Sequence, residues 1–140
     1  TQNARQQKTK YVLIHDAARP NITSEMIDTY IEAAKGYDAL MPVLPMKDTI
    51  YLSQDQKKVT GLIDRNTVFA GQAPEIFDLN KYLKANEDLL PDRIKTVNGS
   101  TEPAVLAGMD ILLFPGDENN YKITTQEDLK RFEAAREKVN

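Results

Sequence analysis

Two segments of this sequence place a charged side chain where an α/β protein binds ligands. Asp16 directly follows an apolar run, and Lys122 lies between a predicted strand and a predicted helix. Ligands of open α/β sheets bind beyond the carboxyl ends of strands, and helix N-termini favour anions. A lone carboxylate at such a strand end can bind Mg²⁺ together with substrate phosphates. The local pattern alone favours a turn-capping role for Asp16, and it does not decide between anion binding and simple solvation for Lys122.

A second pair of residues, Thr49 and Arg65, lies near the base of a predicted β-hairpin. The planar guanidinium of an arginine can hold a phosphate with two parallel hydrogen bonds, and a threonine hydroxyl can add a third. The alternatives are that Arg65 pairs with a neighbouring acid and that Thr49 simply reflects the strand preference of threonine. Taken alone, this pair is a weak signal.

Composition excludes several classes of site. The 140 residues carry a net charge of −3, contain no cysteine and have one histidine, His15. A disulfide, a cysteine nucleophile and a multi-histidine zinc site within one chain are therefore excluded, and we expect His15 to be packed and hydrogen-bonded. Motifs for P-loop, dinucleotide-binding, zinc-protease and serine-hydrolase sites are absent. We expect no nucleic-acid partner, because no basic stripe is present, and no membrane segment, because no apolar run is long enough.

Elements of alternating type must position these residues. Apolar runs predict buried strands at 11–15, 39–45 and 110–115, the first of them central and covered on both faces. Segments 48–53 and 58–64 predict a projecting hairpin. Helical spacing and caps predict helices after Thr23 or Ser24, at 77–85, at 100–108 and after two overlapping capping boxes, Thr124/Glu127 and Thr125/Asp128. The last helix places Leu129, Phe132, Ala135 and Val139 on one face. This order indicates an α/β layered sheet with a hairpin insertion.

Five segments occur in an order that is typical of one family. They run from Tyr11 to Leu129: YVLIHDAARP, PMKDTI, IDRN, GQAPEIF and NYKITTQEDL. The chain thereby resembles the 2-C-methyl-D-erythritol 4-phosphate cytidylyltransferases and the related ribitol 5-phosphate cytidylyltransferases. The resemblance implies a Rossmann-like nucleotidyltransferase sheet with a β-arm, at about residues 46–66, that clasps a second subunit in a homodimer. Residues 1–140 correspond to the C-terminal portion of a single domain, and we expect the Gly-rich nucleotide loop of its N-terminal part to be missing from this chain.

The resemblance also implies roles for individual residues. Asp16 matches the metal-binding aspartate, and Ala17 matches a position that lines the nucleotide site. Thr49 and Arg65 match arm residues that hold the sugar phosphate in the partner's site, and Lys122 matches a lysine that contacts the substrate phosphates. The implied reaction uses CTP and Mg²⁺, and such catalysis needs positioning and charge neutralisation rather than a protein nucleophile. The implied enzyme is cytoplasmic.

Two departures from the family pattern bear on the acceptor. Asn98–Ala104 replaces a Thr-Asp-Asp/Glu-Ala segment, and Gln72-Ala-Pro-Glu75 stands where Gln-Thr-Pro-Gln is usual. Methylerythritol phosphate is the first choice of acceptor, because HDAARP and Asp64-Arg65 are typical of that branch. Ribitol 5-phosphate is the alternative. A third hypothesis, of another class, is a non-catalytic dimerisation or phosphate-binding module without a nucleotide site.

Overall fold

The structure is a computed structural model that describes residues 10–137. Its main sheet has five strands: β1 (Tyr11–Ile14), β2 (Ala39–Pro45), β5 (Phe69–Gly71), β6 (Glu75–Asp78) and β7 (Ile111–Pro115). They pair in the order β1-β6-β2-β5, and β7 also pairs with β2. The β2–β7 pair is parallel and the other pairs are antiparallel. Between residues 10 and 137, no helix is long and apolar enough to cross a membrane.

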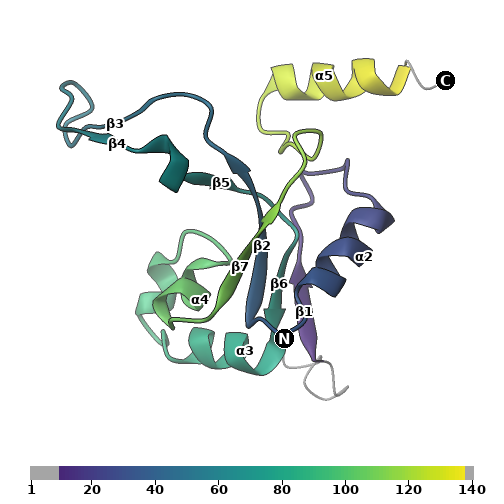
Figure 1. The fold of residues 1–140 in the computed structure, drawn as a ribbon, viewed down its shortest axis with the longest axis vertical. Coiled ribbons are helices and arrows are strands. Elements are labelled where there is room, and N and C mark those ends of the chain that lie inside the picture. Colours follow the sequence, from purple (N-terminus) through teal and green to yellow (C-terminus); the bar gives the residue numbers. More distant parts are fainter. Residues whose placement is uncertain (1–9, 138–140) are drawn as a thin grey trace.

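Helices cover both faces of this sheet, as Figure 1 shows. Helix α2 (Ser24–Ala33) lies on one face, and α3 (Leu79–Glu87) and α4 (Glu102–Leu106) lie on the other. Strand β6 contributes side chains to the core on both faces of the sheet, because successive side chains of a strand point to opposite faces. Ile76 packs with Tyr30 of α2, and its neighbour Phe77 stacks on Tyr82 of α3 with ring centroids 4.1 Å apart.

The predicted strands all form, and β1 lies at an edge of the sheet that the described residues make. Among the described residues it pairs only with β6, and all four of its residues are half-buried. The expectation of a central strand covered on both faces stays a prediction, because the described residues, 10–137, do not include the N-terminal part of the domain that the sequence leads us to expect. The apolar run indicates that both faces contact other groups, but it carries no information about which strands lie alongside.

One correction concerns the helix predicted at 77–85. Phe77 lies in β6, and α3 begins at Leu79. Asp78 caps the helix, since its carboxylate accepts hydrogen bonds from the backbone N–H groups of Asn80 and Lys81 at 3.1 and 3.0 Å. A short apolar run can be a strand or a helix, and here the cap decides the boundary.

Two other helix ends follow their predicted signals. The Thr23 hydroxyl accepts a hydrogen bond from the backbone N–H of Met26 at 3.1 Å, which caps α2. Gly36 and Gly108, just beyond α2 and α4, have φ values of +91° and +67°. Such left-handed conformations favour glycine, which has no Cβ.

The predicted hairpin stands apart from the main sheet. Strands β3 (Ile50–Leu52) and β4 (Gly61–Ile63) form their own antiparallel two-stranded sheet, which projects from the body in Figure 1. The short 3₁₀ helix η1 (Arg65–Thr67) then leads back to β5. The hairpin exposes apolar side chains, with Tyr51 60% and Leu62 67% exposed. Two-stranded hairpins are at best marginally stable in water alone, so this surface is suited to contact with a partner.

The last helix, α5 (Gln126–Glu137), begins at one of the two predicted capping boxes. Thr125 and Asp128 exchange hydrogen bonds between side chain and backbone N–H at 3.1 and 2.9 Å. The second box, Thr124/Glu127, does not form, because Thr124 also bonds to Asp128. These hydrogen bonds, first the one from the backbone of Thr124, hold the pKa of Asp128 below its usual value. Val139, predicted on the apolar face of α5, lies outside the described residues.

Between α3 and α4, the polar segment forms a short 3₁₀ helix, η2 (Arg93–Thr96).

Candidate active site

A cleft at the end of β1 brings Asp16 and Lys122 together. The Lys122 ammonium lies 3.5 Å from the Asp16 carboxylate oxygen Oδ2, and the Arg19 Nε donates a hydrogen bond to the same oxygen at 3.1 Å. All three side chains line a cleft of about 370 Å³. The Arg19 side chain is only 11% exposed, whereas those of Asp16 and Lys122 are 40% and 48% exposed. The cleft therefore presents two cations and one carboxylate at a single point, although 106 positions of sequence separate Asp16 from Lys122.

Hydrogen bonds between two loops hold this arrangement. Arg19 Nη1 donates to the backbone carbonyl of Asn120 at 2.7 Å, and the backbone N–H of Ile123 donates to the carbonyl of Ala18 at 2.8 Å. These bonds tie the loop after β1 to the loop before α5 on either side of Lys122. His15 also belongs to this support, because its Nε2 donates to the carbonyl of Arg19 at 3.0 Å. The prediction that His15 is packed and hydrogen-bonded is confirmed.

Two buried amides fix the loop that carries Lys122. Asn120 is fully buried, and its Nδ2 donates to the carbonyl of Ala73 at 2.7 Å. Gln72 is 6% exposed and bonds to both the carbonyl and the N–H of Asp117, each at 3.0 Å. A Cβ on Gly116 would collide with Gln72 Oε1 and come within 3.1 Å of the Val43 carbonyl oxygen, so a larger residue would displace the buried Gln72 amide. Asn120 Nδ2 and both polar atoms of the Gln72 amide are paired, whereas Asn120 Oδ1 has no partner among the described residues. Buried polar groups are costly unless they are paired, so the bonds that do form favour this loop geometry.

The lining of the cleft also includes a carboxylate with two hydroxyls. Glu75, the first residue of β6, accepts hydrogen bonds at Oε1 from Ser100 Oγ at 2.9 Å and Thr101 Oγ1 at 3.1 Å. Glu102 lines the same cleft, but its carboxylate accepts the backbone N–H of Asn98 at 2.7 Å. The segment that departs from the family pattern therefore forms part of the cleft.

The two arm residues lie elsewhere. Among the described residues that line the cleft, neither Thr49 nor Arg65 is present, and both side chains are exposed. Arg65 Nη1 donates to the carbonyl of Lys47 at 2.7 Å, which closes the base of the arm. Lys47 in turn forms an ion pair with Glu118 of the loop that carries Lys122. One chain thus brings Asp16 and Lys122 together but leaves Thr49 and Arg65 outside their cleft.

Ala17 is exposed on the loop beside Asp16, and it is not among the described residues that line the cleft. Its predicted place at a nucleotide site remains a prediction, since the loop positions its backbone next to Asp16 without enclosing its side chain.

The donor set at Asp16 fits a hard divalent cation held mainly by its substrate. Within residues 10–137, no group of three acidic or histidine side chains converges on one point. Mg²⁺ needs no such cage, because it typically binds one or two carboxylates, substrate phosphates and water. Oδ2 of Asp16 contacts both cations, and Oδ1 contacts neither of them.

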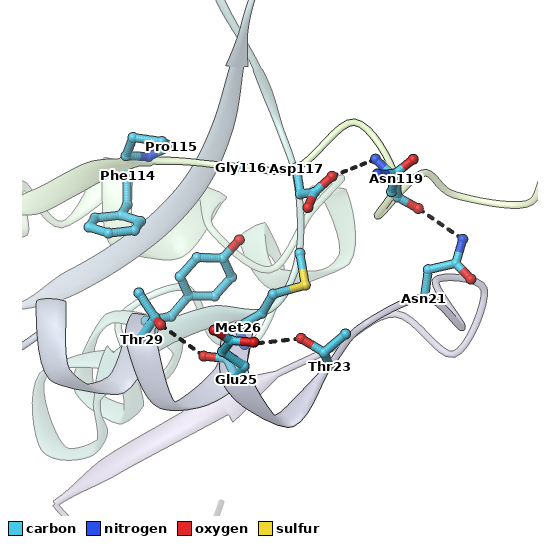
Figure 2. Close-up of a pocket in the computed structure, with 11 residues that line it drawn as sticks. Asn21, Thr23, Glu25, Met26, Thr29, Phe114, Pro115, Gly116, Asp117 and Asn119 are labelled. Carbon is cyan, nitrogen blue, oxygen red and sulfur yellow. Dashed lines mark hydrogen bonds between the residues drawn. The ribbon is translucent and has the colours of Figure 1, made fainter.

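A second cavity, of about 520 Å³, lies between the start of α2 and the end of β7 (Figure 2). Its wall includes Met26, Phe114 and the carboxylates of Glu25 and Asp117, but no lysine or arginine among the described residues. Burial, and next the charge of Asp117, raises the pKa of Tyr30 in this wall. A phosphate there would meet two carboxylates and no cation, so this cavity is not a phosphate site.

Comparisons with known proteins agree with this geometry. The family model for IspD, 2-C-methyl-D-erythritol 4-phosphate cytidylyltransferase, matches residues 2–138. The chain belongs to this family. A 2-C-methyl-D-erythritol 4-phosphate cytidylyltransferase of Roseobacter denitrificans is 38% identical over 127 residues, which are 91% of this chain and 55% of that protein. One of Clostridium beijerinckii is 34% identical over 123 residues, 88% of this chain and 54% of that protein.

Solved structures of IspD proteins have the same fold. The Anaerococcus prevotii 4-diphosphocytidyl-2C-methyl-D-erythritol synthase superposes with a TM-score of 0.82 at 26% identity, covering 93% of this chain and 58% of that one. The Thermus thermophilus 2-C-methyl-D-erythritol 4-phosphate cytidylyltransferase gives a TM-score of 0.77 at 25% identity, covering 97% and 66%. The expected Rossmann-like nucleotidyltransferase fold is thereby confirmed. The chain spans about half the length of the curated relatives it matches.

Proposed function

We propose that the protein takes part in the transfer of CMP from CTP to the phosphate of 2-C-methyl-D-erythritol 4-phosphate, with release of pyrophosphate. The observation that carries the proposal is the meeting of Asp16, Arg19 and Lys122 in one cleft of an IspD-family fold. Residues 1–140 are then the C-terminal portion of a single cytidylyltransferase domain, with its arm at about residues 46–66. A cytoplasmic location belongs to the same proposal, because CTP is available there.

The proposed step joins two anions. An oxygen of the acceptor phosphate bonds to the α-phosphorus of CTP, and the bond from that phosphorus to the departing pyrophosphate oxygen breaks. Two negatively charged groups must therefore approach each other, and the barrier falls when fixed cations neutralise them. Lys122 is the cation that is both exposed to the cleft and fixed by its loop. Mg²⁺, when held by Asp16 and the triphosphate, would supply further neutralisation.

Lys122 and Arg19 have different roles in this proposal. The Arg19 side chain is nearly buried, and its two hydrogen bonds orient Asp16 and the loop that carries Lys122. Lys122 is nearly half exposed, and its ammonium is free to leave Asp16 for a phosphate oxygen. Exchange of a carboxylate partner for a phosphate costs little, because both are anions that accept charge-assisted hydrogen bonds.

Thr49 and Arg65 would complete the site of a second copy of the chain. Both side chains are exposed outside the cleft, and the hairpin surface next to them exposes apolar side chains. A homodimer joined through the arms would bury these apolar side chains and place an arginine fork against the partner's acceptor phosphate.

The direct test is turnover with two acceptors. Residues 1–140 alone are expected to be inactive, because they lack the nucleotide loop, so the test uses the complete protein. With CTP and Mg²⁺, we expect pyrophosphate release with 2-C-methyl-D-erythritol 4-phosphate at a kcat/KM at least about tenfold above that with ribitol 5-phosphate, a difference of roughly 1.4 kcal/mol. The names of the curated relatives support this order. A preference for ribitol 5-phosphate would overturn the choice of acceptor, and turnover of neither by the folded, metal-loaded complete protein would overturn the reaction.

A further inference from the structure

The cleft has two walls of opposite chemistry. Lys122 and Arg19 form a cationic wall that also holds the carboxylate of Asp16, and Glu75 with Ser100 and Thr101 forms a wall of one carboxylate and two hydroxyls. A phosphate is attracted to the first wall and repelled by the carboxylate of the second. The ligand that suits this cleft is therefore not a simple anion, because its far end must offer hydrogen-bond donors.

Glu75 is held ready to accept such donors. The hydroxyls of Ser100 and Thr101 both donate to its Oε1, so the carboxylate is fixed in orientation. Among residues 10–137, no lysine or arginine forms an ion pair with Glu75 and no group donates to its Oε2. A half-buried carboxylate without a cation is uncommon, since its desolvation has to be offset by hydrogen bonds. Because Glu75 lines the cleft, its second carboxylate oxygen is an acceptor available to a ligand there.

We propose that Glu75 determines acceptor specificity by accepting hydrogen bonds from the hydroxyl groups of a polyol phosphate whose phosphate lies against Lys122. Ser100 and Thr101 act through it as positioning residues. This inference rests on the proposed function and deepens it, because it assigns recognition of the alcohol chain to residues that carry none of the phosphate-binding charge. It also gives a role to Glu75 and to the segment at residues 98–102, which are the two places where the chain departs from the family pattern.

The experiment compares two phosphate monoesters that differ in their hydroxyls. The probes are 2-C-methyl-D-erythritol 4-phosphate and butyl phosphate, and their Kd values are measured by calorimetry on the wild-type protein and on variants. The quantity of interest is the ratio of the two Kd values, because the contribution of the phosphate cancels. Hydrogen bonds to a charged group predict a ratio of at least about tenfold in favour of the polyol phosphate.

Two substitutions remove the acceptor to different degrees. Glu75→Gln keeps the shape and one acceptor oxygen for Ser100 and Thr101, and the ratio should fall by about threefold or more. Glu75→Met removes both oxygens, and the ratio should approach one. Butyl phosphate should bind both variants as tightly as the wild type or more tightly, because a negative charge has been removed. Glu87→Gln, at the exposed end of α3, is the matched control and should leave the ratio unchanged.

The outcomes separate this inference from the function on which it rests. A lowered ratio in both Glu75 variants, with butyl phosphate still bound, supports the assignment. A ratio that stays at the wild-type value in folded Glu75→Gln and Glu75→Met overturns it and leaves the proposed function intact. If the wild-type protein binds neither monoester, the proposed function fails, and the assignment of Glu75 fails with it.

Discussion

Replacement of Asp16 by asparagine should lower metal-dependent turnover by on the order of 1,000-fold, which corresponds to roughly 4 kcal/mol of lost transition-state stabilisation. Asparagine has nearly the same shape and can still accept a hydrogen bond from Arg19, so the loop should keep its geometry. What disappears is the negative charge that holds a divalent cation at the carboxyl end of β1. The measurement is kcat with saturating CTP and acceptor across a Mg²⁺ titration.

In the absence of metal, Asp16→Asn should not weaken the binding of phosphate. Asp16 is the anionic partner of Lys122 and Arg19, and its neutralisation leaves both cations free for a phosphate. Inorganic phosphate should therefore bind Asp16→Asn at least as tightly as the wild type in the absence of Mg²⁺. Asp88→Asn is the matched control, since Asp88 forms an exposed ion pair with Lys84 outside the cleft. Unchanged turnover in Asp16→Asn would contradict the proposed metal-binding role of Asp16.

Replacement of Asn120 by alanine should lower the free energy of unfolding by about 2–4 kcal/mol. The side chain is fully buried, and its amide is the donor for the carbonyl of Ala73. Alanine would leave that carbonyl unpaired and open a small cavity beneath the loop that carries Lys122. Urea unfolding, followed by circular dichroism, measures the loss.

The neighbouring Asn119 provides the control for this prediction. It hydrogen-bonds through its backbone, to Asp117 and Asn21, and its side chain is exposed. Asn119→Ala should therefore change the free energy of unfolding by no more than about 0.5 kcal/mol. Equal effects at the two positions would show that the hydrogen bond from Asn120 to Ala73 does not hold the loop.

Local signals in the sequence are sufficient to predict most elements of the fold. Thr23, Thr125 and the two glycines with positive φ mark helix ends whose physical causes lie within a few residues. The same reasoning misplaces Phe77, because a short apolar run fits a strand and a helix equally well. It also leaves the order of the strands open, since strand order depends on pairings between distant segments that no local pattern records.

For the site, the sequence indicates the charged residues and not their supports. Asp16 and Lys122 are predicted from their places at a strand end and before a helix, and they meet in one cleft. Gln72 and Asn120 escape such reasoning, because a polar residue in a loop is ordinarily exposed. The sequence signal for them is that Gln72 lies in the segment GQAPEIF and Asn120 in NYKITTQEDL, both of which match the family pattern. Glu75 stands out in the sequence only as a departure from a pattern, and its hydroxyl partners become visible once β6 and the segment before α4 are placed together.

The position of Arg65 bears on whether the active site is formed by one chain or by two. If Arg65 serves the partner's cleft, Arg65→Ala should weaken use of the acceptor phosphate at low concentration while leaving CTP binding largely intact. Its exposure outside the cleft of its own chain is the structural basis of this expectation.

The most direct test is to mix this variant with Asp16→Asn, each of them nearly inactive at a low acceptor concentration, and to measure turnover after subunit exchange. A heterodimer then contains one site with both substitutions and one site with neither, so random mixing should restore about a quarter of wild-type turnover. If instead Asp16 and Arg65 served the same chain's site, every site would carry a substitution. Turnover that stays at the level of the separate variants, with heterodimers shown to form, would contradict an active site shared between two copies.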